Sequence, residues 1–314
     1  SDSNVDTVAM TKPAKFHLDT ASRELPRGAS AGGTRHILSV GDRPVAAFTQ
    51  GKFRPYIHPV WTPDRVIVTA ECPVDHPHHS GIWCAADHVA ALHDGPDGIE
   101  RYDYCFYVNE VFQGRAPGSI RMTAIELQTA SQAQATVRQE LQWLSPGEWG
   151  GPDGRIVMFE ARTTTVSCVD QAYVFDITSE LRAGENPVEI GPTRHAYFNA
   201  RVCDALALSK QCLPVDDHGR EGAAAIGKKD IGWVDFCGDA GTGAIAGLAT
   251  IPPPETVRDW FLADWGVASV GSFRHARQQV AGDATLHLRC RFVAHDGPLQ
   301  GAQINSQSPH LNPA

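Results

Sequence analysis

Short runs in which apolar and polar residues alternate dominate the chain. Clear examples cover 120–130, 135–144, 156–169, 172–183 and 285–296, and residues such as Gly, Pro, Asn and Asp separate them. Alternation with a period of two is typical of antiparallel strands that bury one face. Helical patterns are sparse, and the best of them predicts one short helix over 255–266.

Two of the runs form the strongest local signal. Runs 156–169 and 172–183 are separated by two residues, which predicts a long hairpin. On its first strand one face would carry Met158, Glu160, Arg162, Thr164 and Val166. The run 135–144 predicts a flanking strand. Many strands without alternating helices favour an all-β fold, a large antiparallel two-sheet β-sandwich with few short helices.

The length of 314 residues exceeds a usual domain, but large sandwiches use such a length as one unit. We expect a single β-sandwich domain over 15–305 and a C-terminal tail over 306–314. Residues 1–14 are expected to be a disordered or expression-derived tail with the native start near Met10; a processed mature terminus is the alternative. A two-domain split near Gly184–Pro192 is less favoured, because the strand pattern does not change there.

Composition narrows the classes of partner. With 42% hydrophobic and 20% charged residues and a net charge of -9, the chain has the composition of a soluble globule, and neither nucleic acid nor a membrane is expected as a partner. No apolar run approaches the roughly 18–20 residues of a membrane span. The eight cysteines are scattered without a CxxC pair, which favours free thiols and a cytoplasmic location. A small-molecule substrate is the expected partner, and a homodimer is compatible with the sequence.

The segment DHPHH, residues 75–79, is the densest polar cluster. It follows the apolar run RVIVTA, which we expect to be a strand, and it precedes GIWCAA. If the segment is extended, His76 and His78 point to one face and His79 to the other.

This cluster has three interpretations. His76, His78 and Asp75 could hold a divalent metal ion, although their spacing matches no standard zinc signature. A metal-free site could instead grip hydroxyls or move protons. In the third, Asp75 caps a turn and the imidazoles pack on Trp83.

Other polar and aromatic residues could contact a ligand. Rings that stack on C–H faces beside polar heads suit a polyhydroxylated or carboxylated ligand, although aromatic strand residues are more often core and a histidine beside core aromatics is more often structural. Candidate substrate-binding residues are Arg54, Tyr56, His58, Trp83, Arg194, Lys228, Arg258 and His275. His195, in GPTRHAYFN, joins His76, His78 and His79 as a candidate catalytic residue. The motifs GxGxxG, GxxxxGK[ST], HExxH and GxSxG are absent, so no nucleotide-dependent or serine-hydrolase chemistry is expected, and no cofactor other than a divalent metal ion is considered.

Four segments carry a family resemblance. They resemble the PmoA-like family of soluble bacterial proteins and follow one another along the chain as RPYIHPVWTPD, DHPHHSGIW, GKKDIGWVDFCG and WGVASVGSFRHA. That resemblance implies a β-sandwich and a carbohydrate or polyol ligand. More loosely, DHPHHSGIW and GPTRHAYFN are similar to the histidine motifs of galactose-mutarotase-type aldose 1-epimerases. This similarity implies a supersandwich, sugar binding by His78 or His79, and His195 as proton donor. The general-base Glu near the C-terminus of those enzymes has no counterpart in GAQINSQSPHLNPA.

Together these patterns predict an enzyme of proton-transfer chemistry, a lyase, epimerase or cyclising isomerase, acting on a carbohydrate-like or cyclic polyoxygenated small molecule. One imidazole of the DHPHH segment would abstract a proton while His195 or Arg54 stabilises the oxyanion. The alternatives are a non-catalytic carbohydrate-binding protein and a metal-dependent enzyme that uses the same histidines as ligands.

Overall fold

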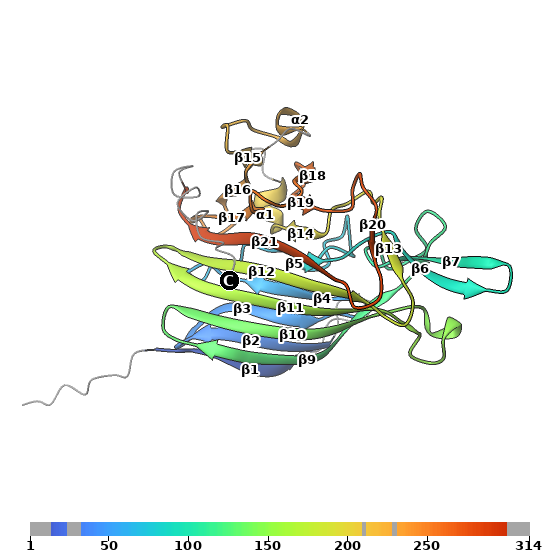
Figure 1. Ribbon diagram of the computed structural model, residues 1–314. Coiled ribbons are helices and arrows are strands. Elements are labelled where there is room, and N and C mark those ends of the chain that lie inside the picture. The colour runs from blue at the N-terminus through green and yellow to red at the C-terminus, as the bar shows by residue number, and fades with distance from the viewer. Residues whose placement is uncertain (1–13, 24–32, 209–211, 228–230, 300–314) are drawn as a thin grey trace, which may run out of the picture.

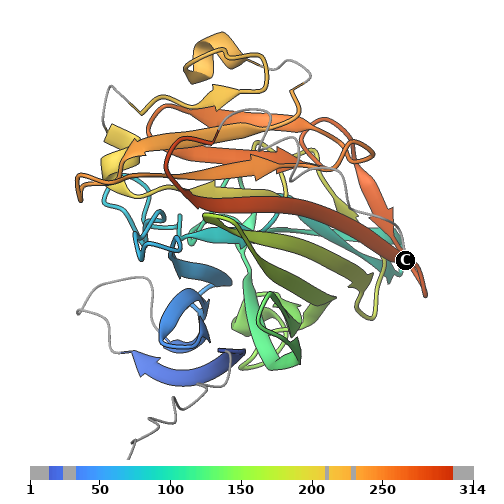
Figure 2. The ribbon, with the colours of Figure 1, turned by 90° about the vertical axis from the view of Figure 1, so that its left-hand side faces the viewer.

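Two eight-stranded antiparallel sheets pack face to face, as Figures 1 and 2 show in views at right angles. The computed structural model describes residues 14–23, 33–208, 212–227 and 231–299. The first sheet has the order β1 (Phe16–Arg23), β2 (Gly33–Val40), β3 (Arg43–Gln50), β4 (Pro55–Val60), β5 (Ile82–Cys84), β14 (Phe198–Arg201), β19 (Val267–Gly271), β18 (Asp259–Ala263). The second has the order β15 (Val215–Asp216), β16 (Val234–Asp239), β17 (Ile245–Ile251), β21 (Thr285–Asp296), β12 (Ala172–Ala183), β11 (Ile156–Val169), β10 (Gln134–Leu144), β9 (Ser119–Ala130).

A third, five-stranded sheet adds to the predicted architecture at the right of Figure 1. Its order is β20 (Gln278–Val280), β13 (Val188–Ile190), β6 (Val89–Gly95), β7 (Gly98–Cys105), β8 (Ala116–Pro117), and only β7 and β8 pair in parallel among the described strands. The described helices are short: η1 (Gly147–Trp149), α1 (Asp204–Leu208) and α2 (Ala223–Ile226). None of them has the length and apolar character needed to cross a bilayer. The all-β antiparallel sandwich is thus confirmed.

The strand predictions are confirmed in detail for the hairpin. Its strands are β11 and β12, and the flanking run is β10. The five residues assigned to one face of β11 are all buried. The eight cysteines are free, as expected. The predicted tails 1–14 and 306–314 lie outside the described residues except for Ala14, and the single domain over 15–305 stays a prediction.

Two predictions of secondary structure are wrong. The segment 255–266 contains a strand, β18, in place of a helix, because Trp260 and Phe261 pair with β19 and Trp260 is buried there. Such pairing outweighs the weak local helical pattern. The run RVIVTA forms only isolated bridges, at Ile67 and Thr69, because it crosses between strands without a continuous partner.

A buried ion pair lies inside the sandwich. Glu160 Oε1 accepts hydrogen bonds from Arg162 Nε at 2.7 Å and from Ser179 Oγ at 2.8 Å. Its Oε1 also accepts from the Tyr197 hydroxyl at 3.0 Å, and its Oε2 accepts from Trp143 Nε1 at 2.9 Å. All these side chains are buried. The carboxylate therefore joins β10, β11 and β12 of the second sheet to the segment that leads into β14 of the first.

We predict that Arg162→Met destabilises the fold by about 3–5 kcal/mol, because it leaves a buried carboxylate without its cation. The matched control is Arg121→Met, which breaks the exposed Arg121–Asp153 pair and should cost less than about 1 kcal/mol. Urea denaturation of the two variants measures the difference. Equal losses would contradict the assignment of the Glu160 cluster as a structural centre.

Candidate functional site

The DHPHH segment folds into two consecutive turns. The His76 amide donates to the carbonyl of Pro73, and the His79 amide donates to the carbonyl of His76. The expectation of an extended segment with alternating faces is therefore wrong, because Pro77 lies within a turn and turn geometry brings the three imidazoles together. The structure places all three predicted histidines in one cluster.

The imidazoles are part of an aromatic stack. The ring centroids of Trp265 and His76 lie 4.2 Å apart, those of His76 and His79 lie 4.8 Å apart, and those of His79 and Trp83 lie 5.0 Å apart. His78 meets His79 edge-on at 4.5 Å. The interpretation in which the imidazoles pack on Trp83 thus describes part of the geometry, and Trp265 extends the stack from a segment far away in sequence.

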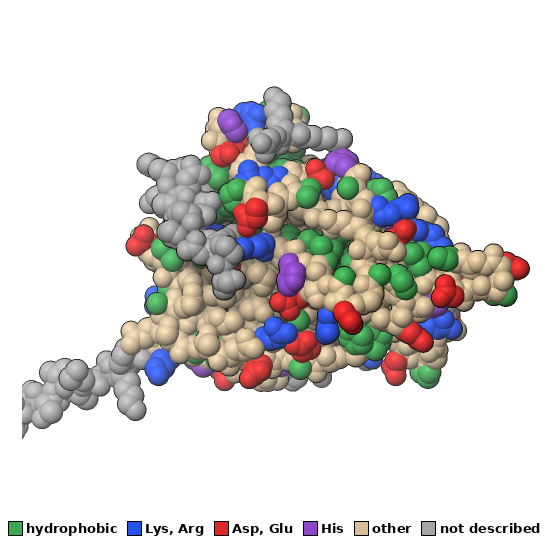
Figure 3. Space-filling view, in the orientation of Figure 1, with side chains coloured by type: hydrophobic (Ala, Val, Ile, Leu, Met, Phe, Trp, Pro, Cys, Tyr) green, Lys and Arg blue, Asp and Glu red, His purple; other side chains and the backbone are tan. Residues whose placement is uncertain are grey.

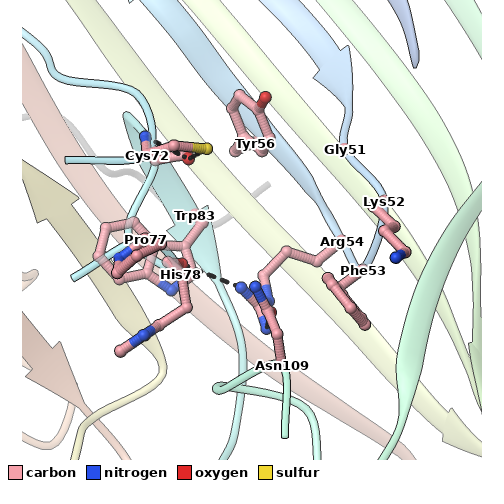
Figure 4. A pocket seen from close by; sticks show the side chains of 11 residues that line it. Gly51, Lys52, Phe53, Arg54, Tyr56, Cys72, Pro77, His78, Trp83 and Asn109 are labelled. Carbon is pink, nitrogen blue, oxygen red and sulfur yellow. Dashed lines mark hydrogen bonds between the residues drawn. The ribbon is translucent and has the colours of Figure 1, made fainter. Parts of the chain in front are cut away.

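Two arginines hold the DHPHH loop in place. Arg201, on β14, lies 4.9 Å from the ring of Trp265 and donates through Nη2 to both carboxylate oxygens of Asp75 at 3.0 Å. Arg54 donates to the carbonyl of His78 at 3.0 Å (Figure 4). Its other bonds go to the carbonyl of Phe106 and to the side chain of Asn109, and burial lowers its pKa to about 10. Arg54 therefore positions His78, a role that the sequence did not predict.

A pocket opens between the start of β4 and the loop, and the hydrogen-bonded residues Arg54 and His78 both line it (Figure 4). It is lined by Gly51, Lys52, Phe53, Arg54, Tyr56, Cys72, Pro77, His78, Ser80, Trp83 and Asn109. Three predicted substrate-binding residues, Arg54, Tyr56 and Trp83, thus share one hollow with a predicted catalytic histidine. Aromatic walls with a few polar groups are typical of small-molecule sites.

The carboxylate of Glu71 holds several side chains next to the pocket. It accepts a hydrogen bond from the Tyr56 hydroxyl at 2.7 Å and pairs with Arg35. His58 lies 3.8 Å from the same carboxylate and contacts Thr69 through Nδ1. Burial, with the Glu71 carboxylate next to it, raises the pKa of Tyr56. Tyr56, which lines the pocket, and His58, which does not, are therefore both held by protein partners.

His195 is oriented by a carboxylate that the sequence reasoning missed. Asp87, which is fully buried, accepts hydrogen bonds through Oδ2 from the backbone amides of Arg194 and His195 and contacts His195 Nδ1 at 3.0 Å. Because the carboxylate can only accept, Nδ1 is assigned as the donor, which leaves Nε2 as an acceptor. The one available signal for Asp87 was an acidic residue directly after the apolar run IWCAA.

Tyr107 brings His195 and the loop histidines together. Its ring stacks on that of His195, with centroids 4.0 Å apart and planes at 5°. His78 and His79 each approach the Tyr107 ring at 5.9 Å with steeply inclined planes. The four histidines therefore lie in one cluster, although His195 is more than a hundred residues away in sequence, and of the four only His78 lines the pocket. No sequence pattern pointed to Tyr107.

Burial favours the neutral form of three of these imidazoles, those of His78, His79 and His195. Burial, with the nearby Arg54 charge, lowers the pKa of His78 to about 3. Burial and neighbouring imidazoles lower the pKa of His79 further. Burial also lowers the pKa of His195, although the hydrogen bond to Asp87 opposes the shift. Among these groups, only His195 has a carboxylate directly at its ring to stabilise the protonated form.

The remaining predicted ligand contacts lie elsewhere. Arg194 is exposed and His275 is exposed after β19, while Arg258 is half-buried just before β18; none of these side chains lines the pocket. Lys228 lies outside the described residues.

The geometry does not favour a metal ion on the loop. In the described part of the chain two groups of three ligating side chains lie close together, and neither includes His76, His78 or Asp75. The rings of His76 and His79 stack nearly parallel, and the Asp75 carboxylate is bound by Arg201. The metal interpretation of the loop stays an untested prediction.

Solved structures with related shapes are distant. A galactose mutarotase related enzyme from Lactobacillus acidophilus is 6% identical, with 89% of this chain and 97% of that chain covered and a TM-score of 0.34. A candidate mutarotase (YeaD) from Salmonella typhimurium is 13% identical, with 88% and 97% covered and a TM-score of 0.31. At these scores the likenesses carry no argument about this chain.

Sequence comparison is more direct. No curated protein matches the chain. The resemblance to the PmoA-like family gains no support from the family comparison. A family model instead matches residues 36–308, nearly the whole chain, and the protein belongs to this family of unknown function, DUF6807.

Proposed function

We propose that the protein is an enzyme, a lyase or isomerase, that transfers protons on a carbohydrate-like or cyclic polyoxygenated small molecule. One observation carries the proposal: the buried Asp87 carboxylate orients His195, whose ring stacks on Tyr107 beside the loop histidines. A carboxylate on Nδ1 fixes the tautomer and stabilises the imidazolium, which is how proteins prepare a histidine for acid/base work. The proposal assigns no step to a metal ion.

We assign the proton-abstracting role to His195. The sequence pattern predicted a loop imidazole as the base and His195 as stabiliser or proton donor, but the contacts of His195 support the reverse assignment. His78, whose pKa is lowered to about 3, is a weak base and keeps its neutral ring at the pocket wall. It can donate or accept one hydrogen bond with a substrate hydroxyl or carbonyl. His76 and His79 then serve mainly as stacking partners.

The residue types that line the pocket suit a polyoxygenated ligand. The lining includes the rings of Tyr56 and Trp83 and, beside them, the polar groups of Ser80 and Asn109. Sugar-like molecules present both C–H faces and hydroxyls, which rings and polar groups can contact. The rival function, carbohydrate binding without turnover, rests on the same rings and does not use the Asp87–His195 pair. Cytoplasmic location and a homodimer remain predictions.

We predict that Asp87→Asn lowers turnover by roughly 10²- to 10⁴-fold, because the amide no longer fixes the tautomer of His195 or stabilises its protonated form. Aldoses, uronates, lactones and dehydro sugars in D₂O form the screening panel. Proton NMR follows loss of C–H signal, anomer exchange and elimination in one experiment. His287→Gln, on an exposed face of β21, is the matched control and should keep full turnover. Binding without turnover by the wild type, or full turnover by Asp87→Asn, would contradict the proposal.

The neutral state of His78 gives a second prediction, on stability. Its pKa in the folded chain lies below the ordinary value of 6.5, so the unfolded chain takes up a proton first as the pH falls. Stability is therefore full above about pH 6.5 and is lost as the pH falls toward 3. His78→Gln should lose about 1–2 kcal/mol less than the wild type between pH 7 and pH 5, allowing for partial solvent screening. Urea denaturation at both pH values measures this, with His287→Gln as control. Parallel curves for His78→Gln and the wild type would show that His78 is not held neutral.

A further inference from the structure

Three metal-ligating side chains meet on the second large sheet, away from the histidine loop. Asp235 and Cys237 lie two residues apart on β16, and His295 lies on β21. One carboxylate oxygen, the thiol sulfur and one imidazole nitrogen all lie within 4.8 Å of one another. Asp235 and His295 are buried, and Cys237 is half-buried. These residues form a compact oxygen, sulfur and nitrogen donor set that is largely shielded from water.

The strand register explains how they meet. Cys237 pairs with Gly247 of β17, and Gly247 pairs in turn with His295. The three residues form one row across three strands, with glycine in the middle. A Cβ atom at Gly247 would lie 2.4 Å from Nε2 of His295. The missing side chain therefore allows the imidazole to lie over β17 and reach β16.

The row lies on the outer face of the sandwich. On the opposite face of these strands Phe236, Leu248 and Ala294 belong to the main core. Ala249 and Val293, which share the face of the donor row, belong to a separate small apolar cluster. The donor set is therefore a local feature of β16, β17 and β21, which lie side by side in Figure 1.

One ring nitrogen of His295 already has a hydrogen-bond partner in the protein. Nδ1 lies 2.8 Å from the carbonyl of Gly297, and because a carbonyl only accepts, Nδ1 is the donor. Nε2 faces the carboxylate of Asp235 at 3.1 Å. Metal-bound histidines use this same arrangement, with one nitrogen anchored to a carbonyl and the other turned to the metal ion.

We propose that Asp235, Cys237 and His295 bind a divalent transition-metal ion, with zinc the best match to these donors. Zinc takes carboxylate, thiolate and imidazole ligands at about 2.0–2.3 Å in a tetrahedral arrangement. Ligand atoms would then be separated by roughly 3–4 Å, which needs only small side-chain movements from the observed cluster. The ion would clamp β16 to β21 across β17, and its fourth position would be filled by water or a ligand.

Proton competition affects the affinity. A metal ion binds the thiolate of Cys237 and the neutral imidazole of His295, so it must displace the thiol proton and any proton on Nε2, and affinity is expected to rise with pH.

Cobalt titration of untagged protein, first treated with EDTA, tests the site, because a thiolate–cobalt contact has a characteristic near-ultraviolet absorption. We expect one Co²⁺ per chain with this absorption, displaced by Zn²⁺. Cys237→Ser should abolish the absorption, and His295→Gln should weaken binding by roughly 100-fold or more. Gly247→Ala should do the same by displacing the imidazole. The matched controls Cys168→Ser and His287→Gln should bind as the wild type does.

Several results would overturn the site. The proposal fails if no Co²⁺ binds or if the absorption persists in Cys237→Ser. It also fails if binding is lost only in His218→Gln or His76→Ala, because the ion then lies elsewhere. If Cys237→Ser does not fold, alkylation of wild-type protein followed by mass spectrometry gives the answer. Zinc should slow the alkylation of Cys237 and leave that of Cys168 unchanged, and equal slowing or none would refute the proposal.

Discussion

The sandwich depends on the buried carboxylate of Glu160, whose burial requires that hydrogen-bond donors surround it. Glu160 receives hydrogen bonds from Arg162, Ser179, Tyr197 and Trp143, and these partners come from three strands of one sheet and from the approach to β14 of the other. Desolvating a carboxylate costs several kcal/mol, which only such complete pairing offsets. The relative position of the two sheets is thus tied to hydrogen-bond geometry as well as to apolar packing.

This constraint extends to the candidate site through the chain itself. Tyr197, held by Glu160, lies two residues after His195, and the amide and ring of His195 are held by Asp87. The imidazole is therefore fixed from both sides of its backbone, while Tyr107 stacks on its ring. Acid/base chemistry needs such fixed placement, since a small displacement of the reacting group costs much of its effect.

The sequence predicts the strands better than it predicts the site. Period-two alternation located β11, β12 and β21 with their ends, because their inner faces pack against a continuous core. The segment around Trp260 was misjudged, since its strand state depends on a partner, β19, that local pattern cannot reveal. In the site the histidines were recognisable by type. Asp87 and Tyr107 were not, because only the fold brings them to His195.

The Glu160 cluster and the histidine stack differ in how completely their polar groups are paired. Around Glu160 every donor that faces the carboxylate is used, whereas both ring nitrogens of His79 and Nε1 of Trp83 are buried without a protein partner among the described residues. An unpaired buried polar atom costs about 1–3 kcal/mol. Because native interiors pair nearly all such atoms, an exception needs a reason, and binding sites are where proteins accept this cost. These atoms belong to rings in one stack with His76, and Trp83 also lines the pocket. The stability that the Glu160 cluster contributes thus offsets the free-energy cost of the unpaired polar atoms in the histidine stack.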